Sequence, residues 1–213
     1  TDVKGLTALG DEGVLAMVCD STNVFEEGES GSEESVKQGL IDLIAEQKQA
    51  VAVTTFASNV ARVKSIVEAA ESAGRAVCLV GRSMHRITDA AKSVGILPPH
   101  MEFIDESEAS QIPAEHILYL CTGSQGEARA ALARISRRDH RNVSLHEGDT
   151  VIFSSRQIPG NEKGIFALQN ALAEQGVRVI TPRMVPYPIH VSGHPCRDEL
   201  RRMYGWVRPQ VSI

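Results

Sequence analysis

The stretch Ala50-Val-Ala-Val-Thr-Thr-Phe-Ala-Ser-Asn59 decides the fold of this chain. It starts as a short apolar run with β-branched residues, and it continues through a polar turn. Apolar residues at helical spacing follow it, at Val60, Val63, Val67 and Ala70. A buried strand that leads through a polar turn into an amphipathic helix is the repeating unit of a parallel sheet. The stretch therefore predicts an α/β domain.

The same alternation of strand and helix patterns recurs along the whole sequence. Apolar runs predict strands at residues 14–19, 50–55, 76–80, 117–121, 150–154 and 177–180. Helical spacing predicts helices between and after them, with inward residues Val36, Leu40, Leu43, Ile44; Met84, Ile87, Ala91, Val94; Ala128, Ala131, Leu132, Ile135; Ile165, Leu168, Leu172; and Leu200, Met203, Tyr204, Val207. We expect a parallel sheet with helices on both faces.

Composition excludes several classes of protein. The 213 residues are 42% hydrophobic and 23% charged, which is typical of a globular domain and not of disordered, collagen-like or coiled-coil chains. No apolar run approaches the length of a membrane span, so we expect no membrane partner. Cys19, Cys78 and Cys121 lie in apolar runs, which predicts buried reduced thiols and a cytoplasmic location. The start at Thr1 has the character of an internal or processed end.

Charge is distributed unevenly along the chain. Residues 1–49 hold 11 acidic and 3 basic residues, whereas residues 129–213 hold 7 acidic and 13 basic ones. The C-terminal third could therefore face a polyanion. A solvated basic surface explains the same count.

Polar residues follow each predicted strand. The segments are Asp20-Ser-Thr-Asn23, Thr54-Thr-Phe-Ala-Ser-Asn59, Gly81-Arg-Ser83, Thr122-Gly-Ser-Gln-Gly126 and Ser154-Ser-Arg-Gln-Ile-Pro-Gly160. Turns at the carboxyl ends of parallel strands lie on one edge of the sheet and open helices whose N-termini favour anions. Five such loops predict a phosphate-binding rim, although Ser, Thr, Asn and Gly are also ordinary cap and turn residues. Neither a G-x-G-x-x-G nor a P-loop signature is present.

Two further features could carry chemistry. His190-Val-Ser-Gly-His194-Pro195 predicts a loop that ends where the last helix begins, with Pro195 at the first helical position. Imidazoles there could bind phosphate, act as acids or bind a metal. Asp20 ends an apolar strand, where its carboxylate could hold a divalent metal or simply cap a turn.

Six motifs, in this order, resemble the ribonuclease J family of the metallo-β-lactamase superfamily. They are Asp20-Ser-Thr-Asn23, Phe56-Ala-Ser-Asn59, Gly81-Arg-Ser-Met84, Thr122-Gly-Ser-Gln-Gly-Glu127, Ile158-Pro-Gly-Asn-Glu162 and His190-Val-Ser-Gly-His194. The resemblance implies a β-CASP domain, a helix-flanked parallel sheet inserted in a metallo-β-lactamase fold. On this basis we expect a metallo-β-lactamase remnant at residues 1–25, the β-CASP domain at 26–207, and a return into the metallo-β-lactamase domain at 208–213.

The resemblance also implies roles for individual residues. Asp20 matches the aspartate that bridges two metal ions, zinc or else manganese or magnesium, and His194 matches a catalytic-site histidine near the scissile phosphate. The substrate-binding loop would also include His190, Val191, Ser192 and Gly193, and the loops facing RNA and its 5′-monophosphate would present Ser58, Asn59, Arg82 and Ser83. The implied whole enzyme is a metal-dependent 5′→3′ exo- and endoribonuclease of RNA maturation and decay, a cytoplasmic homodimer or tetramer.

Departures from the family pattern limit what this chain can do alone. The family's His-x-His-x-Asp-His metal motif is absent from the sequence, which retains only Asp20 of the implied ligands. We therefore expect the chain by itself to bind no metal tightly and to cleave nothing. Local candidates for tracking single-stranded RNA are Arg129, Arg134, Arg137, Arg138 and Arg141. The alternatives are a non-enzymatic phosphate- or nucleotide-binding α/β module, and an interaction domain that docks other subunits through its acidic and basic ends.

Overall fold

Five parallel strands form the sheet that the apolar runs predict. A computed structural model describes all residues, 1–213, and its strands are β2 (Val51–Thr54), β3 (Ala76–Val80), β4 (Ile117–Cys121), β5 (Thr150–Phe153) and β6 (Arg178–Ile180). Their order across the sheet is β3-β4-β2-β5-β6, and every neighbouring pair is parallel. From β2 the chain goes to the edge strand β3, returns to β4 beside β2, and then crosses to β5 and β6 on the other side of β2. Parallel strands on both sides of the first strand are typical of a doubly wound sheet.

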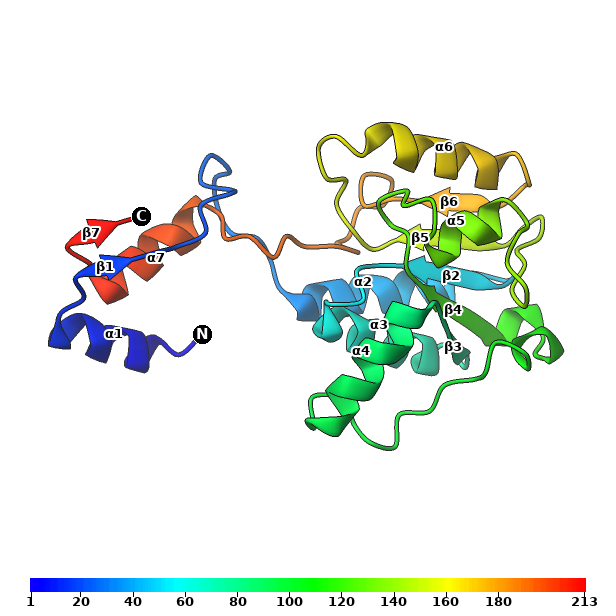
Figure 1. Ribbon diagram of the computed structural model, residues 1–213, viewed down its shortest axis with the longest axis horizontal. Helices are drawn as coiled ribbons and strands as arrows, with labels where there is room; N and C mark the ends of the chain where they lie inside the picture. Colours follow the sequence, from blue (N-terminus) through cyan, green and yellow to red (C-terminus); the bar gives the residue numbers. More distant parts are fainter. The chain divides into compact units, whose positions relative to one another are not determined.

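Helices cover both faces of this sheet (Figure 1). On one face lie α2 (Glu33–Ala45) and α3 (Val60–Ser72), with α4 (Arg82–Ser93) beside α3 and β3. On the other face lie α5 (Ala131–Ser136) and α6 (Glu162–Ala173). Two short 3-10 turns, Ala109–Gln111 and Ala114–His116, precede β4. The predicted α/β class and the helices on both faces are confirmed.

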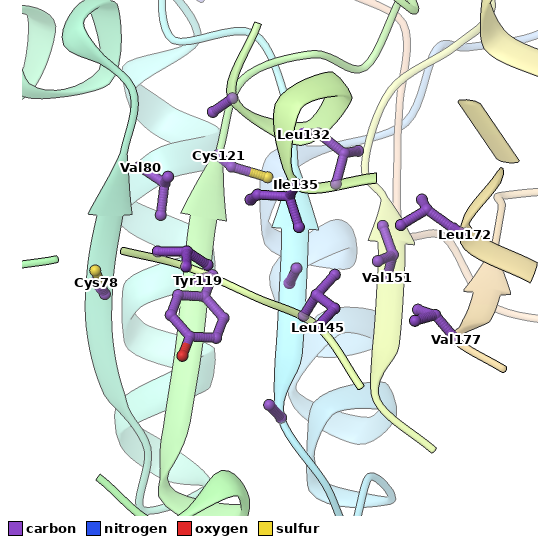
Figure 2. Packing of buried hydrophobic residues seen from close by; sticks show 14 of the residues in the cluster. Cys78, Val80, Tyr119, Cys121, Leu132, Ile135, Leu145, Val151, Leu172 and Val177 are labelled. Carbon is purple, nitrogen blue, oxygen red and sulfur yellow. The ribbon is translucent and has the colours of Figure 1, made fainter. Parts of the chain in front are cut away.

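The core explains why the strands are apolar throughout rather than alternating. Tyr119 and Cys121 of β4 point toward the layer of α5 and α6: Leu132 and Ile135 of α5 lie near Cys121, and Leu172 of α6 lies beside Val151 of β5 (Figure 2). The intervening Leu120 is completely buried and points the opposite way, because successive strand side chains alternate between faces. The strands β2, β3, β4 and β5 are therefore packed on both faces, which fixes the positions at which the loops after them begin.

Two of the expected inward residues are exposed. Val94 is 69% exposed because α4 ends at Ser93, which leaves Val94 at the cap. Ala128 is exposed because α5 begins only at Ala131. In both cases the apolar spacing continues beyond the end of the helix that it predicts.

Residues Thr1–Ser32 and Val191–Ile213 form a compact unit of their own, and Glu33–His190 form the larger one. The smaller unit contains α1 (Val3–Glu12) packed on α7 (Arg197–Val207), and β1 (Ala16–Met17) paired in parallel with β7 (Val211–Ser212). The strand expected at 14–19 is thus only two residues long and lies outside the main sheet. Pro195 precedes the cap residue Cys196, so the expectation that it occupies the first helical position is wrong.

The cysteines are all free thiols. Cys78 and Cys121 are fully buried, as predicted, and burial raises the pKa of each thiol to about 12. Cys19 is only partly buried. None of the helices combines the length and the apolar character that crossing a membrane requires.

Candidate phosphate groove and histidine sites

The loops after β2, β3 and β4 line a groove of about 940 Å³ at the carboxyl ends of these strands. Its walls include Ser58 from the first loop, Arg82 and Ser83 from the second, and Thr122 and Ser124 from the third. The structure thus brings together three of the residues expected to face phosphate. The loops after the neighbouring strands β2 and β4 lead to helices on opposite faces of the sheet, α3 and α5 (Figure 1), and the space between such loops is the usual place for ligands in doubly wound folds.

The charge of the groove suits an anion. Arg82 and Arg86 lie one turn apart at the start of α4, and Arg129 lines the groove from the segment before α5. Glu127 is the only carboxylate among the lining residues. The first turn of α4 adds backbone N–H groups with no partner inside the helix. Arg86 was missed by the sequence analysis, although its spacing of four from Arg82 places both on one helix face.

Only three of the five predicted rim loops line the groove. The loop after β5 packs against the loop after β4 through Gln125, whose Nε2 donates to the carbonyl of Arg156 at 2.9 Å. The Oε1 of Gln125 accepts from the backbone N–H of Ile158, also at 2.9 Å. The Asp20 loop belongs to the smaller unit, so it is not part of this sheet edge. The rim is therefore smaller than predicted.

Most of the candidate arginines after residue 128 are tied to their own unit. Arg134 and Arg137 donate to backbone carbonyls at 3.0 Å, and Arg138 donates to the Gln175 side chain at 3.1 Å. Arg129 is the one that lines the groove. Part of the positive charge in the basic C-terminal third of the sequence is therefore used for hydrogen bonds within the chain.

Asn59 caps a helix. Its side-chain oxygen accepts from the backbone N–H of Arg62 at 3.0 Å, which satisfies one of the free donors at the start of α3. Asn59 does not line the groove, whereas its neighbour Ser58 is exposed and does. The structure therefore separates the two residues into a cap and a groove wall.

His190 is the last residue of the larger unit. Its Nδ1 lies 3.2 Å from Nη1 of the buried Arg62. Burial, and then the charge of Arg62, lower the pKa of His190 to about 4. The ring is consequently neutral at physiological pH.

The smaller unit brings Asp20 and His194 together. The Nδ1 of His194 lies 2.6 Å from Oδ2 of Asp20, while Oδ1 accepts from the backbone N–H of Thr22 at 2.9 Å and from its hydroxyl at 2.7 Å. These hydrogen bonds, that of His194 first, lower the pKa of Asp20 to about 2. The carboxylate therefore orients the imidazole and leaves Nε2 of the ring for another partner.

Three further hydrogen bonds hold the loop that carries His194. Asn23 donates from Nδ2 to the Ser192 hydroxyl at 2.9 Å and to the His194 carbonyl at 3.2 Å. The Ser192 hydroxyl also accepts from the backbone N–H of His194 at 3.1 Å. Val191 lies against Gly31, and Gly193 is exposed. Within the predicted substrate loop, the Ser192 hydroxyl therefore holds the backbone of His194 in place.

The titration of Asp20 tests this pair. We expect a carboxyl ¹³C NMR titration midpoint near 2 in the native chain and a rise toward 3.8 in His194→Ala. Because the folded-state pKa is depressed, the pair's contribution to stability is complete above the unfolded pKa of about 3.9 and is lost as the pH falls through about 2. The exposed His100→Ala should leave the midpoint unchanged. A native midpoint near 3.8 would rule out the bond.

A parallel sheet covered on both faces, with a basic groove at the carboxyl ends of its strands, defines a doubly wound α/β domain. Residues 48–172 match the family described as "Ribonuclease J, beta-CASP domain". This match spans more than half of the chain and includes all three loops of the groove. The chain belongs to the ribonuclease J β-CASP domain family.

Similar proteins carry the same name. "Ribonuclease J" of Sinorhizobium meliloti is 50% identical over 213 residues, which cover 100% of this chain and 37% of that protein. "Ribonuclease J" of Corynebacterium glutamicum is 42% identical, covering 100% of this chain and 30% of that protein. "Ribonuclease J" of Mycolicibacterium smegmatis is 42% identical, covering 99% of this chain and 38% of that protein. The chain spans about a third of the length of these curated relatives.

The family implies metal dependence, and the residues of this chain do not fit a metal centre by themselves. No group of three His, Cys, Asp or Glu side chains is arranged to hold an ion. Asp20 offers one carboxylate, and its neighbour His194 already turns Nδ1 toward it. The expectation that the chain alone binds no metal tightly stays a prediction.

Proposed function

We propose that this chain is the RNA-binding β-CASP part of a metal-dependent ribonuclease with 5′→3′ exonucleolytic and endonucleolytic activity. The observation that carries the proposal is the basic groove at the carboxyl ends of β2, β3 and β4. The proposed domain division, at residues 25/26 and 207/208, goes with it. The substrate would be single-stranded RNA that ends in a 5′-monophosphate.

The lining of the groove supports this substrate class. A terminal monophosphate carries more charge than an internal phosphodiester, so three arginines and a helix N-terminus favour the RNA end over its middle. Phe56 lines the same groove and is 37% exposed, which offers a ring on which a base can stack. Phosphate and base contacts side by side are typical of single-strand recognition.

The second part of the proposal concerns cleavage. Asp20 and His194 are hydrogen-bonded to each other although they lie far apart in sequence. A carboxylate that fixes the tautomer and orientation of an imidazole is a common arrangement at reacting phosphates and carbonyls. We propose that His194 acts at the scissile phosphate and that Asp20 orients it. A module that only binds a small phosphorylated ligand has no use for this pair, which favours the nuclease.

Replacing Arg82 tests the groove. We expect Arg82→Ala to bind a 5′-monophosphorylated oligoribonucleotide about tenfold more weakly, because a charge-assisted phosphate contact contributes roughly 1.5 kcal/mol. Binding of the same oligonucleotide with a 5′-hydroxyl should change little. Fluorescence anisotropy at one fixed salt concentration measures both affinities.

Arg178→Ala is the matched control. It removes the same charge from an exposed arginine of the same unit, at the start of β6 and so at the amino end of the sheet. We expect it to affect the two oligonucleotides equally. If Arg82→Ala also weakened both equally, the groove would not recognise the 5′ end. If a mononucleotide bound as tightly as the oligonucleotide, the small-ligand module would be favoured.

A further inference from the structure

Arg62 carries a charge that no water reaches. Its guanidinium is completely buried, and its Nε and Nη2 donate to the two carboxylate oxygens of Glu33 at 2.8 Å each. Nη1 faces the carbonyl of Ser154 at 3.1 Å, the Ser154 hydroxyl at 2.9 Å and Nδ1 of His190 at 3.2 Å. The two-pronged ion pair compensates the buried charge and holds the guanidinium plane in one orientation.

The contact with Arg62 favours one position of the His190 ring proton, in competition with the backbone carbonyl of Ser154, which can accept from a ring N–H. A guanidinium has only donors, so Nδ1 of His190 can take part only through its lone pair. The proton of the neutral ring is then on Nε2. An imidazolium would turn a second donor toward Nη1 and would add a positive charge beside Arg62. The other charged groups that act on the ring are Glu33, which favours its protonation, and Arg156, which opposes it.

Glu33 and His190 are also the first and last residues of the larger unit. One guanidinium therefore holds the points at which the chain enters and leaves this unit. The Ser154 hydroxyl also holds the chain where it leaves the unit, because this hydroxyl donates to the carbonyl of Ile189 at 2.7 Å and accepts from Arg62. The segment that continues toward His194 thus starts from a fixed residue.

We propose that Arg62 is a positioning residue that fixes His190 as a neutral imidazole protonated at Nε2. His190 is then a hydrogen-bond donor at every physiological pH and never a proton source. Taken with the proposed function, on which this part rests, the group that Nε2–H recognises is a phosphate oxygen or a ribose hydroxyl of the RNA. The acid–base work is left to His194.

Nitrogen NMR of ¹⁵N-histidine-labelled chain tests the inference without RNA. Two-bond ¹H–¹⁵N correlations distinguish the two tautomers, and His190→Gln identifies the signal. We expect the Nε2–H form alone at pH 7 and no titration above pH 5. A ring protonated at Nδ1, or one that titrates near the ordinary 6.5, would overturn it. The native spectrum decides this, so the test does not depend on a variant that folds.

Variants then assign the effect to Arg62. In Arg62→Lys the ammonium can still pair with Glu33 but lacks the fork that also reaches His190, so we expect a mixture of tautomers and a pKa of His190 that rises toward 6.5. The double variant Arg62→Met, Glu33→Gln, which removes the charge pair together, should do the same. An unchanged tautomer in a folded variant would assign the effect to Ser154 and contradict the role of Arg62.

Adding a 5′-monophosphorylated oligoribonucleotide separates this inference from the proposed function. We expect the Nε2 signal of His190 to shift on binding. A native tautomer with no shift would support the role of Arg62 and contradict the proposed RNA contact. A wrong tautomer would overturn the role of Arg62 whether or not RNA binds.

Discussion

Asp20→Asn is expected to slow RNA cleavage at least about 100-fold in a whole ribonuclease that carries this chain. The amide keeps the size of the side chain, but it has one acceptor where the carboxylate has two. In the native chain Oδ2 of Asp20 accepts a hydrogen bond from His194, and Oδ1 accepts one from Thr22. The single amide oxygen of asparagine can accept from only one of these two residues with good geometry, so the imidazole loses its fixed tautomer and orientation. The measurement is single-turnover cleavage of a 5′-monophosphorylated RNA.

The partner substitution makes the test specific. His194→Ala should lose activity to a similar extent, and the double variant should be no slower than the slower single one, because residues that act as a unit are not additive. Affinity for the 5′ end should stay within about twofold of native, since the groove lies in the other unit. Asp42→Asn, at an exposed position of α2, is the control for the chemical change. Full activity in either single variant would contradict the proposed roles.

Gly126→Ala is expected to destabilise the larger unit by about 3 kcal/mol or more. Gly126 has a φ of +74°, and a Cβ placed there would lie 2.4 Å from the carbonyl carbon of Gly164 and 2.6 Å from the backbone nitrogen of Ile165. Both are backbone atoms in the first turns of α6, so neither can move without shifting the helix. Urea unfolding followed by circular dichroism measures the loss.

Gly74→Ala separates the two causes of the stability loss expected for Gly126→Ala, which are the steric clash of the new Cβ and the strain of the left-handed conformation. Gly74 has a similar φ of +68°, but no atom lies within 4 Å of the Cβ position. We expect this variant to lose only about 1 kcal/mol, the cost of the left-handed conformation. Equal losses in the two variants would show that the close approach of the Gly126 loop to α6 is unimportant. The groove-lining residues Thr122 and Ser124 precede Gly126 in this loop, so its displacement should also weaken phosphate binding.

The main sheet could be predicted because its signals are local. Four of its five strands are largely apolar runs that are buried almost throughout, and most helices between them have a clear apolar stripe. Only the edge strand β6 begins with an exposed residue, Arg178. Helix α1 gave no such signal. It contains Gly5 and Gly10, and it packs on α7, where a Cβ on Gly10 would lie 2.3 Å from the carbonyl oxygen of Trp206. Its stability depends on a neighbour from the far end of the chain.

The candidate sites could be predicted only in part, for the same reason. Ser58, Arg82 and Ser83 share the groove because parallel strands bring their carboxyl ends together, which the order of motifs indicates. Arg62 lies in an apolar helix pattern, and its partners Glu33 and His190 are remote in sequence. No local pattern distinguishes such a residue from a solvated arginine. The sequence indicated Asp20 and His194 as separate features, and only the structure shows the hydrogen bond between them.

The contacts of Arg62 with Glu33 and His190 affect the order in which the two units fold. β1 and β7 come from opposite ends of the chain, so their pairing must close a loop that contains the whole larger unit. Once that unit has folded, Glu33 and His190 are held together, and the loop left to close is roughly fivefold shorter. Loop entropy then opposes the pairing by about 1.5 kcal/mol less. The larger unit should therefore fold first and act as the template on which the two chain ends find each other.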